Sequence, residues 1–389
     1  MIRQSLFPLA AALCIAAAGQ TRLAEPVIQA VVDKIKDRIA SREIAGAVTL
    51  VVDRTSVRHL SAEGLQDIAA GTPMRPDTLF WIASMTKPIT GVAVMMMVDE
   101  GRLSLDDPVS RHIPEFAGLL DASGQRVKVT VRQLLTHTSG LGELTGSQWK
   151  ECRTLADTIP YVVAHPVLFP PGTQWSYCQS GINTAARIVE VLSGQSFPEF
   201  LEKRLFGPLG MRDTTFYLRR DQLPRLAAAY SRNADGQLVE AQNFLLMGRA
   251  PDSTDRLPAA NGGLFSTAPD YGRFCQMLLN SGSFRGRQLL TPEAVRTLRS
   301  VHSGSLATGF TSGNGWGIGV CVVREPQGVT AMLSPGSFGH GGAFGTQAWI
   351  DPVKGLAYIL MVQRADFPNA DASDVRREFQ ETAAAALAR

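Results

Sequence analysis

The stretch Ala83-Ser84-Met85-Thr86-Lys87-Pro88 places a serine three residues before a lysine. The apolar run Val92–Val98 follows it and predicts a buried helix. Residues i and i+3 share a face of a helix, so Ser84 and Lys87 are expected to lie together near its N-terminal end. A hydroxyl beside an amine is one way to build an activated nucleophile.

The composition allows a large core and excludes several classes of function. The chain has 389 residues, of which 45% are hydrophobic and 19% charged, with a net charge of +3. That length fits one large domain or two lobes. The small net charge, with no run of Lys or Arg, argues against nucleic-acid binding. No His/Cys cluster with metal-ligand spacing occurs, so neither a metal nor another cofactor is expected.

The N-terminus predicts export from the cytoplasm. Arg3, the apolar stretch from Ser5 to Gly19 and the small residues Ala16-Ala17-Ala18 are typical of a signal peptide over residues 1–18. We therefore expect a periplasmic or secreted protein. No later segment is long enough to span a membrane. The four remaining cysteines allow three disulfide pairings or four buried thiols: Cys152, Cys178, Cys275 and Cys321.

The order of patterns predicts an α/β (α+β) fold. Strand signals occur near both ends of the chain, and helical patterns dominate between them. We expect an antiparallel sheet formed from the N- and C-terminal segments and flanked by helices, with a mostly helical lobe inserted. Residues 25–389 would form one catalytic domain, with an α/β lobe at about 25–100 and 230–389 and a helical lobe at about 101–229. The predicted strands are 45–53, 56–61, 316–324, 345–351 and 356–363, and the predicted terminal helices are 27–41 and 371–388.

Two further clusters accompany Ser84 and Lys87. Tyr177 and Gln179 follow a Pro-Gly-x-x-Trp loop, and His340-Gly341-Gly342 precedes a late strand. In this order the clusters resemble the serine β-lactamase and penicillin-binding-protein superfamily, most of all class C β-lactamases and related esterases of the family VIII carboxylesterase type. The resemblance covers about Ala45 to Arg364. Further matches are Leu135-Thr136-His137-Thr138-Ser139-Gly140-Leu141, Pro208-Leu209-Gly210-Met211 and Gly262-Gly263-Leu264-Phe265-Ser266-Thr267.

The resemblance assigns expected roles to individual residues. Ser84 would be the acyl-accepting nucleophile and Lys87 its base, which requires burial to lower the lysine pKa from about 10.4 to about 7. Tyr177 would take the serine proton as a phenolate or relay it to the leaving group. The backbone N–H groups of Ser84 and Ala343 would form the oxyanion hole.

The substrate-binding positions depart from the family pattern. Gln179 stands where the family usually has Asn, and His340-Gly341-Gly342 replaces the Lys-Thr-Gly triplet. A histidine is charged only part of the time near pH 7, and Gly341 has no side chain. Both changes weaken the capture of a substrate carboxylate. His340 is expected either to hydrogen-bond Tyr177 or the substrate, or to be structural.

Other arrangements of nucleophilic residues are disfavoured. His137 and Ser139 are spaced i, i+2 and do not face each other on a helix, so we interpret them as structural. No G-x-S-x-G motif occurs, which argues against an α/β-hydrolase.

Three functions stay open from the sequence. The favoured one is a secreted serine hydrolase that acts on esters of a small or medium acyl group through an acyl-enzyme on Ser84. The second is a class C-like β-lactamase or a D-amino-acid peptidase acting on cell-wall peptides. The third is a non-catalytic peptidoglycan-associated binder on the same fold. The expected partner is a small ester or peptide-like molecule, and the oligomeric state is not predicted.

Overall fold

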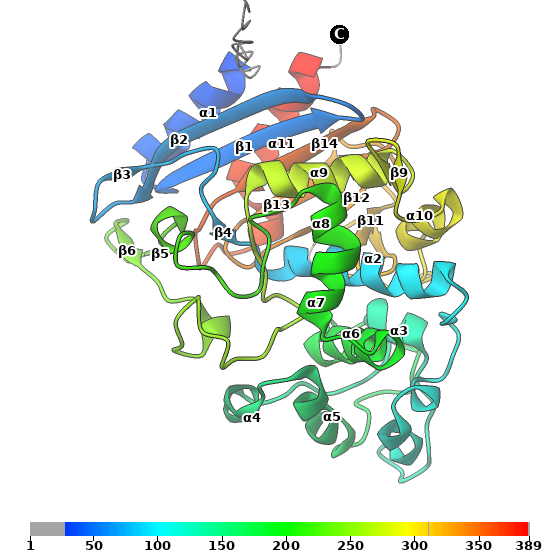
Figure 1. Ribbon diagram of the computed structural model, residues 1–389. Helices are drawn as coiled ribbons and strands as arrows, with labels where there is room; N and C mark the ends of the chain where they lie inside the picture. The colour runs from blue at the N-terminus through cyan, green and yellow to red at the C-terminus, as the bar shows by residue number, and fades with distance from the viewer. Residues whose placement is uncertain (1–27, 310, 388–389) are drawn as a thin grey trace, which may run out of the picture.

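A computed structural model describes residues 28–309 and 311–387 (Figure 1). The predicted signal peptide, residues 1–18, lies outside the described residues, so export stays a prediction. Among the described residues, no helix is long and apolar enough to cross a membrane.

The central element is an eight-stranded antiparallel sheet in the order β10-β11-β12-β13-β14-β1-β2-β3. The sheet joins the two ends of the chain, because β1 pairs with β14 and Val48 lies opposite Met361. The predicted fold class is therefore confirmed. The strands of this sheet are β1 (Gly46–Asp53), β2 (Val57–Asp67), β3 (Thr72–Pro73), β10 (Asn314–Trp316), β11 (Cys321–Val323), β12 (Phe338–Gly341), β13 (Gln347–Asp351) and β14 (Leu356–Met361).

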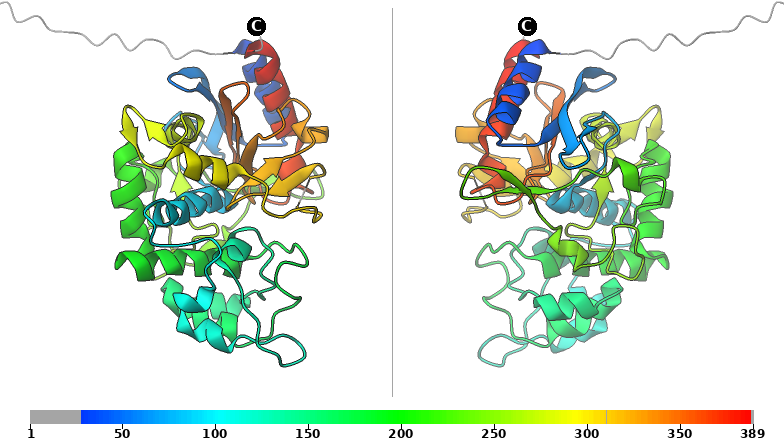
Figure 2. Two further views of the ribbon diagram at one scale, coloured as in Figure 1. Left: turned by 90° about the vertical axis from the view of Figure 1, so that its right-hand side faces the viewer. Right: turned by 90° about the vertical axis from the view of Figure 1, so that its left-hand side faces the viewer.

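Helices cover both faces of the sheet. The terminal helices α1 (Gln29–Ala40) and α11 (Asp374–Leu387) lie side by side on one face (Figure 2). The alternation of β14 explains this arrangement, because Tyr358 and Leu360 face these helices while Ile359 and Met361 face the interior around α9 and α2. Helix α9 spans Ala268–Leu279 and α2 spans Thr86–Asp99.

The middle of the chain is mostly helical; residues 131–193 lie below α2 in Figure 1, and residues 197–209 rise past α2 toward α9. Its main helix is α6 (Gln179–Ser193), which packs on α2 and ends at Gly194 in the left-handed conformation, φ 71°. The other helices are α3 (Val131–Leu135), α4 (Gly146–Glu151), α5 (Leu155–Val163), α7 (Phe197–Leu201), α8 (Gly207–Leu209) and α10 (Pro292–Arg299). Short two-stranded sheets pair β4 (Phe80–Trp81) with β7 (Phe265–Ser266), β5 (Tyr230–Arg232) with β6 (Leu238–Glu240), and β8 (Ser283–Phe284) with β9 (Arg287–Gln288).

One predicted strand is wrong. Residues 316–324 do not form a continuous strand but the hairpin of β10 and β11, in which Asn314 lies opposite Val323. Two glycines lie between these strands. Gly319 adopts a left-handed conformation, with φ 71°, and Gly317 lies so close to α10 that a Cβ there would be 2.4 Å from the carbonyl oxygen of Leu298. Residues 316–324 were predicted as one strand because β10 and β11 are both buried and apolar residues therefore continue through the turn.

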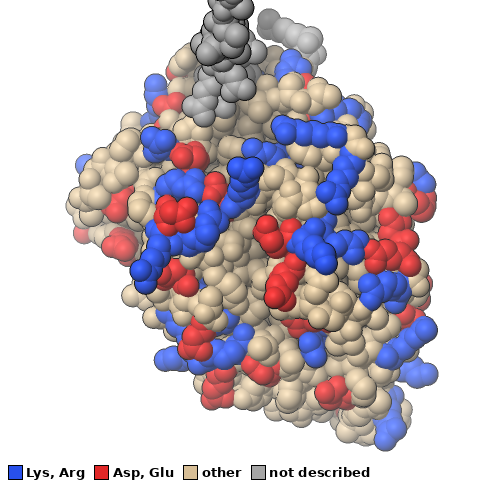
Figure 3. Space-filling view, viewed as in Figure 1, with Lys and Arg blue, Asp and Glu red and all other residues tan. Residues whose placement is uncertain are grey.

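The cysteines and charges complete the description. Cys152, Cys178, Cys275 and Cys321 are all buried free thiols, so none of the three possible pairings forms. On the face shown in Figure 3, basic and acidic side chains are interspersed rather than gathered by sign.

The packing of α2 against the β10–β11 turn predicts a sensitive position at Gly91. A Cβ there would lie 2.3 Å from the carbonyl oxygen of Ile318, so Gly91→Ala should lower the free energy of unfolding by about 1–3 kcal/mol through overpacking. Gly118→Ala is the matched control, because Gly118 is exposed and a Cβ there meets nothing within 4 Å. Urea denaturation checks both, and equal stability of the two variants would contradict the account.

Candidate active site

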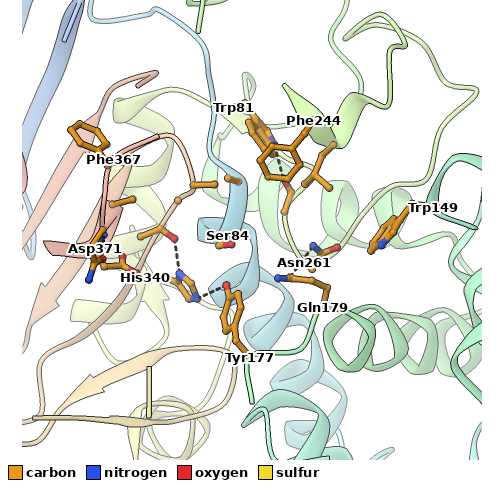
Figure 4. A pocket seen from close by; sticks show the side chains of 18 of the residues that line it. Trp81, Ser84, Trp149, Tyr177, Gln179, Phe244, Asn261, His340, Phe367 and Asp371 are labelled. Atoms are coloured by element: carbon orange, nitrogen blue, oxygen red, sulfur yellow. Dashed lines mark hydrogen bonds between the residues drawn. The ribbon is translucent and has the colours of Figure 1, made fainter. Parts of the chain in front are cut away.

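A pocket of about 630 Å³ opens beside the N-terminal end of α2. Ser84 lies in its middle, between the edge of β12 and the helical region (Figure 4). His340, Gly341 and Asp371 line one side, and Gln179, Asn261 and Trp149 line the other. The sequence clusters that were predicted to form one site are thus brought together.

Ser84 lies in the 3₁₀ helix Ala83–Met85, immediately before α2 begins at Thr86. The preceding residue Ala83 has φ 47°, in the left-handed region that non-glycine residues rarely adopt. Such backbone strain costs about 1–3 kcal/mol and is concentrated at functional sites. The strained turn aims Ser84 into the pocket, while Ala83 and Met85 on either side are buried.

Lys87 is fully buried behind Ser84. Its Nζ lies 3.1 Å from Ser84 Oγ and donates to the carbonyl oxygen of Asn261 at 2.8 Å. Burial lowers the pKa of Lys87 to about 7, although the negative charge of Glu143 acts in the opposite direction. The amine is therefore available as a base near neutral pH, as the sequence interpretation required.

Tyr177 faces the same pair from the turn before α6. Lys87 Nζ lies 4.5 Å from the centre of its ring, and its hydroxyl lies 3.4 Å from His340 Nε2. Burial raises the pKa of Tyr177 well above 10, and a hydrogen bond with Ser84 only partly opposes this effect. This direction favours a neutral phenol, and with it the role in which Tyr177 relays the proton to the leaving group over the role of a phenolate base.

His340 is neutral rather than partly charged. Burial, followed by the charge of Lys87, lowers its pKa to about 3, which corrects the expectation from its ordinary pKa. Its Nδ1 lies 2.6 Å from the carbonyl oxygen of Gly341. A carbonyl only accepts, so Nδ1 carries the proton and Nε2 accepts from Tyr177.

The side chain of Gln179 is oriented by a polar network. Asn261 Nδ2 donates to Gln179 Oε1 at 3.0 Å, so the Gln179 NH₂ group is left to face the pocket as a donor. Asn183 Nδ2 in turn donates to Asn261 Oδ1 at 3.0 Å. At the start of α6, Glu143 accepts from the backbone N–H groups of Gln179 and Ser180, which fixes the turn that carries Tyr177.

The turn after β12 approaches the Ser84 segment closely. A Cβ on Gly342 would lie 2.6 Å from the carbonyl oxygen of Ile82, so only glycine fits. Thr346 Oγ1 donates to the same carbonyl at 3.3 Å. Ala343 and Ser84 both line the pocket, and the oxyanion hole between their N–H groups stays a prediction.

His137 lies behind the site and does not line the pocket. Its Nδ1 accepts from the backbone N–H of Cys178 at 3.0 Å, and its ring lies 4.6 Å from that of Tyr177. This placement agrees with a structural role.

Several pocket residues had no signal in the sequence. Asn261 precedes the matched Gly262-Gly263 segment but belongs to no spaced motif, and Asp371 was assigned only to the last helix. Aromatic side chains from distant segments complete the wall: Trp81, Trp149, Phe244 and Phe367.

The fold and the Ser84–Lys87 pair define a β-lactamase-fold serine hydrolase. The Beta-lactamase family model matches residues 31–383, and the chain belongs to that family. It is 34% identical to Protein Rv1367c of Mycobacterium tuberculosis over 85% of this chain and 88% of that protein. It is 31% identical to Esterase EstB of Burkholderia gladioli over 84% and 88%. The solved structure of EstCE1, described as a hydrolase with promiscuous acyltransferase activity, shares the fold with TM-score 0.79 and 24% identity over 92% and 97% of the two chains.

The buried histidines predict that stability falls in acid. Burial lowers the pKa of His59 to about 4 and that of His340 to about 3, and it lowers the pKa of His137 well below 6.5. Below about pH 6.5 these histidines bind protons in the unfolded chain but stay unprotonated in the folded chain. Each histidine should therefore remove about 1.4 kcal/mol of unfolding free energy per pH unit until its folded pKa is reached.

Urea denaturation between pH 7 and pH 5 measures this slope. His340→Gln should reduce the mean slope over this range by about 1 kcal/mol per pH unit, because one buried titrating group is removed. An unchanged slope in this variant would show that His340 is protonated in the folded protein.

Proposed function

We propose that the protein hydrolyses carboxylic esters through an acyl-enzyme on Ser84. The observation that carries this proposal is the 3.1 Å contact between Lys87 Nζ and Ser84 Oγ, with burial holding the lysine pKa at about 7. A serine hydroxyl needs such a neighbouring base to become nucleophilic. The same geometry argues against a purely non-catalytic binder.

The residues divide the chemistry between them. Neutral Lys87 takes the proton of Ser84 while Oγ bonds to the substrate carbonyl carbon, and the N–H groups of Ser84 and Ala343 stabilise the oxyanion. The proton then passes from Lys87 through the Tyr177 hydroxyl to the departing alcohol oxygen as the ester C–O bond breaks. Water attacks the acyl-enzyme by the reverse route, releasing the acid and restoring Ser84.

Esters are favoured over β-lactams or D-Ala peptides because the described residues that line the pocket include no Lys or Arg to bind a substrate carboxylate. His340 is neutral at the place of the family's lysine, and Gly341 has no hydroxyl. Esterase EstB, a relative, is named for the same kind of activity.

Hydrolysis of p-nitrophenyl butyrate and of nitrocefin, measured side by side, tests the substrate class. We expect ester turnover to exceed nitrocefin turnover, and Ser84→Ala to lower ester turnover by about 10⁴-fold or more because the covalent route is lost. Strong nitrocefin turnover without ester hydrolysis would favour the β-lactamase alternative. Full activity of Ser84→Ala would refute the mechanism.

The pH dependence of kcat/KM tests the role of Lys87. Activity should rise with pH through about 7, as the ammonium loses its proton and becomes the base. Glu143→Gln should move the midpoint to lower pH, because the Glu143 carboxylate raises the pKa of Lys87. The midpoint is the readout, since Glu143 also holds the Gln179 turn and its loss can lower the rate itself. A midpoint that does not move, or moves upward, would contradict this role.

A further inference from the structure

Asp371 is the one charged side chain among the described residues that line the pocket. It comes from the 3₁₀ turn Ala370–Ala372, ahead of α11, and lies at the side of the pocket beyond His340 (Figure 4). The pocket of an enzyme expected to hydrolyse esters of a small or medium acyl group thus contains a carboxylate.

Asp371 occupies the space beside Gly341. A Cβ on Gly341 would lie 1.8 Å from Asp371 Oδ1, so a side chain at position 341 and the present position of Asp371 exclude each other. The resemblance places a Thr hydroxyl, suited to a substrate carboxylate, at position 341. Here the protein's own carboxylate fills that space.

A second layer of residues holds Asp371 in place. The Trp349 indole donates to Gln347 Oε1 at 2.9 Å, which turns Gln347 Nε2 toward Asp371 Oδ1 at 3.2 Å. Arg376 is buried, and its guanidinium carbon lies 4.1 Å from the centre of the Trp349 ring. The guanidinium also donates to the backbone carbonyl of Asp371. Burial raises the pKa of Asp371, while the charge of Arg376 and the Gln347 hydrogen bond act in the opposite direction and favour the carboxylate.

The position of Asp371 relative to Tyr177 decides which part of a substrate it meets. Tyr177 delivers a proton to the departing alcohol in the proposed mechanism, and its hydroxyl points to His340 Nε2. The alcohol part of an ester therefore extends toward His340 and Asp371. The aromatic ring of Phe367 lines the same side of the pocket, and the guanidinium carbon of Arg364 lies 5.0 Å from the centre of this ring.

We propose that Asp371 is a specificity-determining residue that makes the pocket select esters with a cationic, ammonium-bearing alcohol and reject those with an anionic one. This inference rests on the proposed ester hydrolysis at Ser84. An ammonium gains a charge partner at Asp371, whereas a carboxylate meets a like charge in a site where neighbouring residues exclude part of the water.

Three thioesters of matched size test the inference through release of the thiol: butyrylthiocholine, its neutral 3,3-dimethylbutyl analogue and S-butyryl-3-mercaptopropionate. At pH 8 the wild type should prefer the cationic over the anionic substrate by about 100-fold in kcat/KM, and Asp371→Asn should cut this ratio by about tenfold or more. The ratio is the readout because changes in the shared acylation chemistry cancel. Asp366→Asn is the matched control, since Asp366 is exposed and outside the pocket lining, and it should keep the wild-type ratio.

The outcomes separate the two claims. Hydrolysis that persists in Ser84→Ala refutes the proposed function. Loss of hydrolysis in Ser84→Ala, with an unchanged charge ratio in Asp371→Asn, refutes only the role of Asp371. Competitive inhibition of the wild type gives an independent measurement if Asp371→Asn does not fold: choline should bind about tenfold more tightly than 3,3-dimethylbutanol, and equal binding would overturn the inference.

Discussion

The burial of the Lys87 amino group is the constraint on which the rest of the site depends. A lysine so enclosed cannot keep its ordinary pKa, because water no longer stabilises its charge. The fold encloses it by packing α2 between the sheet and α6, and its Nζ donates to the backbone carbonyl of Asn261. The environment that makes Lys87 costly to bury is the same one that makes it a base beside Ser84.

The sheet sets the rest of the geometry through close backbone contacts. Gly342 lets the β12–β13 turn approach Ile82, and Ala83 accepts a left-handed conformation at the same place. Strand β12 places His340 in a buried environment, where the imidazole stays neutral and Nε2 accepts a hydrogen bond from the Tyr177 hydroxyl. At the position where the family has Lys-Thr-Gly, His340-Gly341-Gly342 therefore presents an uncharged surface, and the Asp371 carboxylate lies next to it.

Much of this arrangement could be predicted from local patterns. The apolar patterns of the strands indicated a sheet formed from both ends of the chain, and Gly194 indicated the end of α6. The spacing of Ser84 and Lys87 indicated their contact. Protonation states could not be predicted, because they depend on burial by segments far apart in the chain; His340 and Tyr177 are the examples. The place of Asp371 in the pocket could not be predicted for the same reason, because only the fold brings the turn Ala370–Ala372 against Gly341. The hairpin at Gly317 and Gly319 was missed because buried arms on both sides imitate one strand.

The most direct test of the account is the side-chain titration of Lys87 itself. NMR of protein labelled with ¹⁵N and ¹³C at lysine, with the Lys87 signal assigned by its loss in Lys87→Met, follows the ammonium as it becomes an amine. The account predicts a midpoint at about 7. A midpoint near the ordinary lysine value of about 10.4 would show that Lys87 stays charged at neutral pH and would contradict its role as the base for Ser84.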